Sequence, residues 1–253
     1  AVIDPGPEDD AHLETLLTAI AGRPVSHIFV SHTHRDHSPL AARLKELTGA
    51  PTLAEGPHRP ARPLRIGEVN PLDASADLAF VPDVVLADNA LTQGDGWAIR
   101  TVLTPGHTAN HAVFALEGAG TLFSADQVMA WSTSIVAPPD GAMADYMSSL
   151  DKLLAREDRM LLPGHGGPVT APGRFMRGLK THRKMRERAI LERIRAGDRT
   201  ITEMVAAIYR DTDPRLHGAA GLSVLAHLED LVARGLVTTE GDAAIDGLFS
   251  PAA

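Results

Sequence analysis

The chain has 253 residues, of which 44 % are hydrophobic and 22 % charged, so it can bury a sizeable core and is not a disordered protein. Its sequence contains no cysteine, which excludes disulfide scaffolds, thiol nucleophiles and thiolate metal ligands. A net charge of −8 argues against a basic nucleic-acid coat protein. Because no apolar run approaches the ~18 residues of a membrane span and no signal peptide is visible, we expect a cytoplasmic protein without a membrane partner.

Two modules are predicted, residues 1–173 and 174–253, which meet at a stretch rich in glycine and proline. The first alternates strand-like and helix-like segments, a pattern typical of a layered α/β structure. Ser38, followed by a proline, has the residue type of a helix N-cap, and Gly49 would end that helix. The other expected elements of this module are a helix over 144–155 and strands over 25–30, 98–103, 111–116, 121–123 and 160–162.

Residues 55–73 are predicted to form a long irregular connection, because they contain four prolines. The same segment carries three arginines, Arg59, Arg62 and Arg65. It is either a solvated loop or a loop that offers cations to a substrate. The solvated loop is the preferred interpretation.

The second module is predicted to begin with a basic helix, since residues 174–200 hold 10 basic and 3 acidic residues, a net charge of 10 − 3 = +7. Thr200 and Glu203 fit a capping box at the start of the next helix. Three helices followed by a hairpin resemble a winged helix-turn-helix. The expected elements are helices over 174–196, from 200 onward and over 219–234, and strands over 236–239 and 243–248.

The third of these helices is the candidate recognition helix, and its charges do not favour nucleic acid. It carries Glu229 and Asp230 against Arg234, whereas a groove-reading helix presents cations and amides. We therefore favour a packing role for the module. The basic stretch still leaves a contact with a phosphate backbone open.

The densest chemical signal runs from His32 to His37, in the sequence His-Thr-His-Arg-Asp-His. His32 and His34 lie two residues apart in an extended turn, so they can point the same way and bind one ion. Asp36 and His37 follow and face a second position. Imidazole and carboxylate ligands without thiolate suit Zn²⁺, and also Mn²⁺ or Fe.

Three further segments offer ligands of the same kinds. His107 and His165 each stand in a Pro-Gly-His turn, and Asp126 ends a predicted strand. Each segment alone is a weak signal. Together they occupy the loop that follows a strand, which is where the active sites of layered α/β proteins gather.

These four segments, in this order, resemble the metallo-β-lactamase fold superfamily over residues 1–173. The resemblance implies an α+β protein, a four-layer αββα sandwich with the metal loops at one edge of its two sheets. Asp4 resembles a strand-end aspartate that supports the site. Because strands normally precede Asp4 in this superfamily, the amino-terminal strands are expected to be truncated. The implied ligands are His32, His34 and His107 for one metal, Asp36, His37 and His165 for the other, and Asp126 between them.

The same resemblance implies a dinuclear metal-dependent hydrolase with two Zn²⁺ per chain. A hydroxide bridging the two ions would attack the carbonyl of a small ester, thioester or lactone, with Asp36, His37 and Asp126 as catalytic residues. A regulator that uses the metal only to stabilise its fold is disfavoured, because the ligand set is complete. The oligomeric state stays open.

The tail is similar to a narrower branch, the β-lactamase-like protein 2 group with its winged-helix-like extension. Human-type members of this branch cleave single-stranded RNA, whereas its bacterial members are mostly unassigned hydrolases, so the resemblance implies a metal-dependent endoribonuclease as the alternative function. RNA would be favoured if the basic helix and the three arginines of residues 55–73 lined the cleft. The segments that carry this similarity are His182-Arg183, Arg186-Glu187, Leu225, His227-Leu228, Leu231, Ser132-Thr133 and 138–141.

The remaining candidates have weaker signals. His111 is interpreted as a surface residue at a strand start rather than a group at the site, His182 as a helix-packing residue, and Tyr146 as a core residue. The histidines assigned to the surface are His12, His27, His58 and His217.

Overall fold

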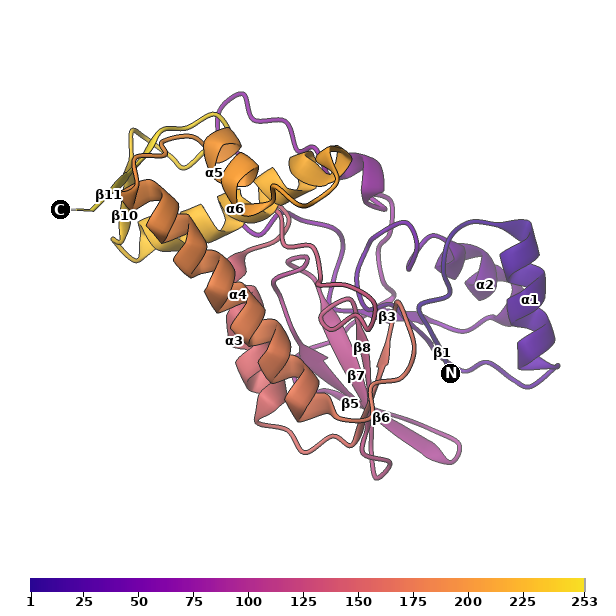
Figure 1. The fold of residues 1–253 in the computed structure, drawn as a ribbon. Coiled ribbons are helices and arrows are strands. Elements are labelled where there is room, and N and C mark those ends of the chain that lie inside the picture. Colours follow the sequence, from indigo (N-terminus) through magenta and orange to yellow (C-terminus); the bar gives the residue numbers. More distant parts are fainter. Residues whose placement is uncertain (253) are drawn as a thin grey trace.

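The computed structural model describes residues 1–252, which form two β-sheets flanked by helices, with a helical module across one side (Figure 1). The strand orders are β1-β2-β3-β4 in the first sheet and β5-β6-β7-β8-β9 in the second. A separate two-stranded sheet pairs β10 with β11 near the C-terminus.

The first sheet is parallel throughout and has very short strands. Asp9 starts the helix after the first strand by accepting a hydrogen bond from His12 N. The apolar side chains of the two helices pack against Ile28 and Val30. The elements are β1 (Val2–Ile3), α1 (Asp10–Ile20), β2 (Ile28–Phe29), α2 (Leu40–Thr48), β3 (Thr52–Ala54) and β4 (Val84–Val85).

Helix α2 begins one residue later than the sequence predicts. Ser38 does not cap it, because Ser38 Oγ donates to Asp77 Oδ2 at 2.8 Å, and Pro39 takes the N-cap position. Gly49 ends the helix as predicted, with a φ of 73° that glycine adopts without strain.

The second sheet is antiparallel except for its last pair, in which β9 runs parallel to β8. Helix α3 packs on it through Tyr146, Leu150 and Leu153, which are fully buried. Tyr146 is therefore the core residue that the sequence predicts. The elements are β5 (Leu91–Gly94), β6 (Trp97–Leu103), β7 (Ala112–Leu116), β8 (Thr121–Ala125), β9 (Met160–Pro163) and α3 (Met143–Leu154).

The core clusters show four layers. One cluster joins α1 and α2 to the first sheet, a second joins the two sheets through Phe29 and Phe114, and a third joins the second sheet to α3. The αββα sandwich and the α+β class are thereby confirmed.

The C-terminal module has the predicted helices and a displaced hairpin. Thr200 and Glu203 form the predicted capping box at the start of the second helix. A long first helix packs against α3, and the later helices form a core of their own (Figure 1). The elements are α4 (Pro172–Arg195), α5 (Ile201–Ile208), α6 (His217–Ala233), β10 (Val237–Thr239) and β11 (Phe249–Pro251).

The sequence predicts the second hairpin strand over 243–248, but the structure has it later, at Phe249–Pro251. Ala243 is buried there, but Ile245 and Leu248 are exposed. Phe249 is the residue that fills the helical core, and its N–H donates to Arg199 O. The tertiary contact of Phe249, rather than the local apolar run, therefore sets the start of β11.

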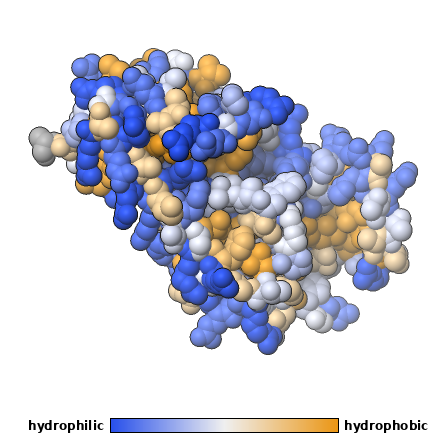
Figure 2. Space-filling model, in the orientation of Figure 1, coloured by the Kyte–Doolittle hydropathy of each residue, from blue (hydrophilic) through white to orange (hydrophobic). Residues whose placement is uncertain are grey.

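Between residues 1 and 252, no helix combines the length and apolar character that a membrane crossing requires. Hydrophilic residues cover most of the face in Figure 2, and hydrophobic residues gather over the central strands.

Candidate metal centre

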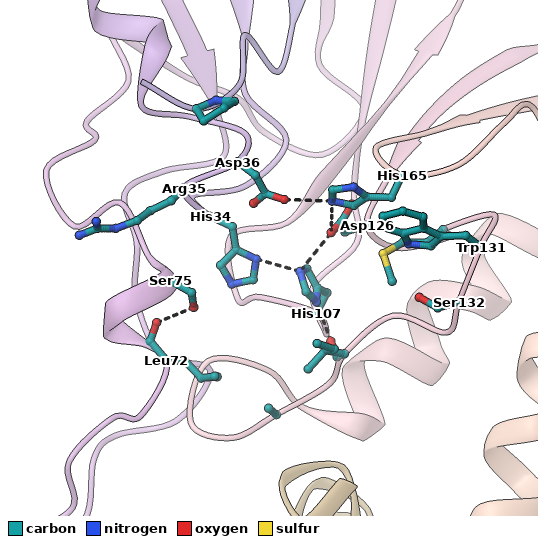
Figure 3. Close-up of a pocket in the computed structure, with 14 residues that line it drawn as sticks. His34, Arg35, Asp36, Leu72, Ser75, His107, Asp126, Trp131, Ser132 and His165 are labelled. Carbon is teal, nitrogen blue, oxygen red and sulfur yellow. Dashed lines mark hydrogen bonds and ion pairs between the residues drawn. The ribbon is translucent and has the colours of Figure 1, made fainter. Parts of the chain in front are cut away.

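The seven predicted ligands lie at the ends of strands from both sheets. His32, His34, Asp36 and His37 occupy the connection from β2 to α2. The other three follow strands of the second sheet: His107 after β6, Asp126 after β8 and His165 after β9. The structure brings all seven together, as Figure 3 shows for five of them.

Three histidines form the first group. His34 Nδ1 lies 3.0 Å from His32 Nε2 and 3.0 Å from His107 Nε2. Ligand nitrogens around one tetrahedral Zn²⁺ would stand about 3.3 Å apart, because each Zn–N bond is about 2.0–2.1 Å. The three nitrogens therefore have the spacing of a single metal position.

The second group contains Asp36, His37 and His165. Asp36 Oδ2 lies 3.0 Å from His165 Nε2 and 3.6 Å from His37 Nε2. Asp126 stands between the groups: its oxygens lie 3.6 Å from His37 Nε2, 3.5 Å from His165 Nε2 and 3.8 Å from His107 Nε2. The carboxylate of Asp126 can thus face both positions.

A glycine leaves room for this carboxylate. A Cβ on Gly164, in the second Pro-Gly-His turn, would lie 2.6 Å from Asp126 Oδ1 and 2.8 Å from His37 Cε1. Both distances are too short for real contacts, so a side chain at this position would displace candidate ligands.

Hydrogen bonds on the far side of the rings fix their orientation. His37 Nδ1 donates to Asp4 Oδ2 at 2.9 Å, and His32 Nδ1 lies 2.9 Å from Ser31 Oγ, which in turn donates to Asp4. His107 Nδ1 donates to Ile135 O at 2.6 Å. These bonds direct the second ring nitrogen of each histidine toward the cluster.

Burial keeps the first group neutral. It lowers the pKa of His32 and His107, and it lowers the pKa of His34 to about 3, with the neighbouring histidines adding to the effect on His34. A neutral imidazole is the form that binds a metal ion.

The side chains of His37 and Asp126 shift each other's pKa. Burial by itself would lower the pKa of His37, but Asp4 and Asp126 outweigh it and raise this pKa to about 10. Burial likewise opposes ionisation of Asp126, yet His37 holds the pKa of that carboxyl well below its usual range. Asp126 is therefore an anion at neutral pH.

The cluster fits a pair of divalent cations. His37 Nε2 and Asp126 Oδ1 are buried and have no hydrogen-bond partner among the described residues. Buried polar atoms without partners are costly unless something else satisfies them. Ligands of nitrogen and carboxylate oxygen that face one another suit Zn²⁺, Mn²⁺ or Fe.

Two buried histidines contradict their assignment to the surface. His111 is fully buried, receives a hydrogen bond from Asp126 N at Nε2, and contacts Thr104 Oγ1 through Nδ1 at 2.8 Å. Only 5 % of the His58 side chain is exposed, and its Nδ1 lies 3.1 Å from Thr33 Oγ1. The four-residue spacing from His107 was a signal for His111, whereas nothing local marks His58.

A cavity of about 670 Å³ opens over the cluster, and His34, Asp36, His107, Asp126 and His165 form part of its lining (Figure 3). The indole of Trp131 stacks on His165, with ring centroids 5.4 Å apart and planes within 2°. The rest of the wall is mostly apolar. It includes Leu72, Met129, Trp131, Ile135 and Ala137, with Arg35 at one side.

The arginines of residues 55–73 are engaged elsewhere. Arg62 and Arg65 both bind Glu229 of α6 at 3.0 Å, and Arg59 pairs with Glu55. None of these three arginines belongs to the lining of the cavity. The segment therefore attaches the C-terminal module and does not supply cations over the cluster.

Comparison with known proteins identifies the family. Residues 1–165 match the model of the metallo-β-lactamase superfamily. The chain belongs to this superfamily. Residues 200–246 match the β-lactamase-associated winged helix domain, as the sequence predicts for this region.

Individual relatives of the chain agree with the family. A β-lactamase-like protein 2 homolog from Drosophila melanogaster is 30 % identical over 250 residues, which cover 92 % of the chain and 78 % of the relative. An atrochrysone carboxyl ACP thioesterase from Paecilomyces divaricatus is 28 % identical over 82 % of the chain, but the match spans only 62 % of that protein. A β-lactamase domain protein from Burkholderia ambifaria shares the fold, with a TM-score of 0.80, 21 % identity, and coverage of 98 % of this chain and 81 % of that one.

Proposed function

We propose that the chain is a dinuclear metallohydrolase that cleaves a small ester, thioester or lactone. The observation that carries this proposal is the convergence of seven histidine and aspartate side chains in one cluster, five of which line the cavity, in two groups with Asp126 between them. Membership of a superfamily of hydrolases supports it. We further propose cytoplasmic action and a division of the chain at residue 173.

The proposed ligands follow the two groups. His32, His34 and His107 would hold one ion, Asp36, His37 and His165 the other, with Asp126 between them. Zn²⁺ is the preferred ion, and Mn²⁺ or Fe would suit the same ligands. Divalent ions bound here would lower the pKa of water toward about 7 and stabilise negative charge that develops on a substrate carbonyl.

The protein's own groups would then orient and transfer protons. Asp4 holds the ring of His37 through Nδ1, so that His37 Nε2 stays directed at Asp126. Asp36 lines the cavity and its side chain is 51 % exposed, which leaves a carboxylate oxygen within reach of a substrate. We assign Asp36 to take the proton released when water adds to the carbonyl carbon and to return it to the leaving oxygen or sulfur.

The cavity wall supports a substrate with an apolar acyl part. Trp131, Ile135 and Leu72 offer apolar surface, and the volume of about 670 Å³ suits a small organic molecule. A thioesterase among the relatives agrees with this chemistry. RNA would instead need a row of cations along its phosphates, and the cavity offers Arg35 alone among the described residues.

A substrate panel on metal-reconstituted protein tests this function. Aryl esters and thioesters with matched leaving groups, a lactone and a single-stranded RNA would be compared, with Asp126→Asn as the inactive control. We expect turnover of the carbonyl substrates that a chelator abolishes and added Zn²⁺ restores. Hydrolysis of RNA alone, or ester hydrolysis unaffected by Asp126→Asn, would refute the proposal.

A further inference from the structure

Arg183 lies in the basic helix α4 but is buried, with 4 % of its surface exposed. Its guanidinium stands over the ring of Tyr146 in α3, 5.1 Å from the ring centroid. Its hydrogen-bond acceptors in the described chain, Ser134 O and Ser223 Oγ, are neutral oxygens. Burying a cation against neutral partners costs free energy, so stability alone does not account for this residue.

The carbonyl that Arg183 binds belongs to the cavity wall. Ser134 O and Ile135 O are consecutive carbonyls of one segment without regular secondary structure, and Ile135 lines the cavity. Arg183 donates to Ser134 O, and His107 Nδ1 donates to Ile135 O at 2.6 Å. The opposite nitrogen of His107 lies 3.0 Å from His34 Nδ1 within the cluster. Two residues of backbone therefore connect Arg183 to the ring of His107.

We propose that Arg183 is a positioning residue, through which the C-terminal module sets the orientation of His107 and thereby the affinity of the first metal position. The inference rests on the proposed role of His107 as a metal ligand. Metal-binding histidines depend on the acceptor at their other ring nitrogen, and loss of such a partner typically costs 10–100-fold in metal affinity. Here that acceptor is a backbone carbonyl, so its position depends on what holds the segment.

Other contacts keep the segment folded when Arg183 is changed. Ser134 Oγ donates to Gln127 O at 3.3 Å, and Tyr146 Oη donates to the same carbonyl at 3.2 Å. These bonds come from the N-terminal module, whereas Arg183 supplies the link from α4. Removing Arg183 should therefore let the peptide between Ser134 and Ile135 shift without unfolding the wall.

The burial of Arg183 also changes the expectation for the basic helix. The sequence suggests Arg183, together with Lys184 and Arg186, as a contact for RNA phosphates. The guanidinium of Arg183 is enclosed by Tyr146, Ser134 and Ser223 and does not face solvent. A substitution here would act on the cavity rather than on a nucleic-acid surface.

Zinc titration of Arg183→Met, with Arg186→Met as matched control, tests the proposal. Methionine keeps much of the volume and removes the cation together with its hydrogen bonds. Arg186 lies on the same helix, but its guanidinium stacks on Tyr209, 4.5 Å from the ring centroid. Competition with a chromophoric chelator would resolve the two zinc equivalents of each protein.

We expect Arg183→Met to bind one equivalent about 10-fold or more weakly and the other within about 2-fold of wild type. Arg186→Met should bind both within about 2-fold of wild type. The absorption bands of Co²⁺ in the weakened position should shift in Arg183→Met alone. Two results would overturn the inference while leaving the proposed function intact. One is a folded Arg183→Met protein that binds both zinc equivalents with wild-type affinity, and the other is equal weakening of zinc binding in Arg183→Met and Arg186→Met.

A second variant covers misfolding. If circular dichroism shows that Arg183→Met is unfolded, Arg183→Lys keeps the charge on a single donor nitrogen but loses the planar fork. We expect intermediate weakening of the same single equivalent, and wild-type binding of both equivalents would refute the inference. Wild-type protein that takes up no metal at all would refute the proposed function together with it.

Discussion

At the scale of residues, hydrogen bonds from the protein itself orient the candidate ligands. Asp4 orients His37 directly and His32 through Ser31, while Ile135 O orients His107. Fixing tautomer and ring angle in this way removes an ordering cost that a metal would otherwise meet. The consequence is that small changes at the shared carboxylate should affect metal content far more than folding.

Asp126→Asn tests the shared carboxylate. An amide offers one neutral oxygen in place of an anion that faces both groups, so we expect the bound metal to fall toward one equivalent and turnover to fall on the order of 100-fold or more. Elemental analysis and steady-state kinetics on the same sample measure both effects. Wild-type turnover in a variant with one metal missing would show that the second position is not catalytic.

Gly164→Ala tests the space around the same carboxylate. The new methyl would press on Asp126 Oδ1 and His37 Cε1, so zinc binding should weaken while the melting temperature changes little. Gly167→Ala is the control, because a Cβ there meets nothing within 4 Å. If both variants bind zinc equally well, Gly164 does not protect the cluster.

At the scale of elements, loops after strands hold the ligands and helices hold the loops. Helix α6 shows that such packing can leave a polar side chain without a partner. It buries His227, and neither ring nitrogen of His227 has a hydrogen-bond partner among the described residues. Burial, followed by the charge of Arg183, lowers the pKa of His227 to about 3. His227 is therefore neutral in the folded protein at every pH at which the unfolded chain would begin to protonate it.

In His227→Leu, the free energy of unfolding should fall less steeply than in wild type as pH drops below about 6.5. The folded pKa lies below the unfolded value of about 6.5, so the proton equilibrium of His227 does not affect stability above pH 6.5 and destabilises the fold increasingly as pH falls from about 6.5 toward 3. At pH 5 the cost amounts to about 2 kcal/mol. Urea unfolding at pH 7 and pH 5 should show a smaller loss in His227→Leu than in wild type. Parallel losses would contradict the buried, neutral state of His227.

At the scale of the whole molecule, α4 and the 55–73 segment join the two modules on different sides. Glu229 of α6 forms ion pairs with both Arg62 and Arg65, and α4 packs along α3. The arginines that suggested a nucleic-acid surface thus serve the contact between modules. Beside the cavity wall, Arg183 of α4 donates to Ser134 O, next to Ile135, which lines the cavity.

Glu229→Ala should weaken this attachment. Because the Glu229 side chain is 20 % exposed and pairs with two arginines, we expect a loss of about 2 kcal/mol in unfolding free energy with zinc content unchanged. Glu187→Ala, which breaks a pair with Arg234 inside the C-terminal module, should cost less than about 1 kcal/mol. Equal losses in the two variants would argue against a special role for the contact between modules.

The sequence predicts the layers and the convergence of the metal-binding segments, because short spacings and strand-end positions are local. His32 and His34 are two residues apart, and Pro-Gly-His turns recur at His107 and His165. Long-range packing decides what the sequence misses: the burial of His58 and His111, the late start of β11 and the inward direction of Arg183. Each of these features is decided by contacts with residues that are distant in the sequence.

The metal content of reconstituted wild-type protein tests the central claim most directly. Protein saturated with Zn²⁺ and freed of excess would be analysed for its zinc-to-chain ratio. The arrangement of two groups around Asp126 predicts a ratio of about two, and a chelator should remove ester hydrolysis and zinc together. A folded protein that retains no zinc, or that hydrolyses its substrate equally well without zinc, would contradict the account.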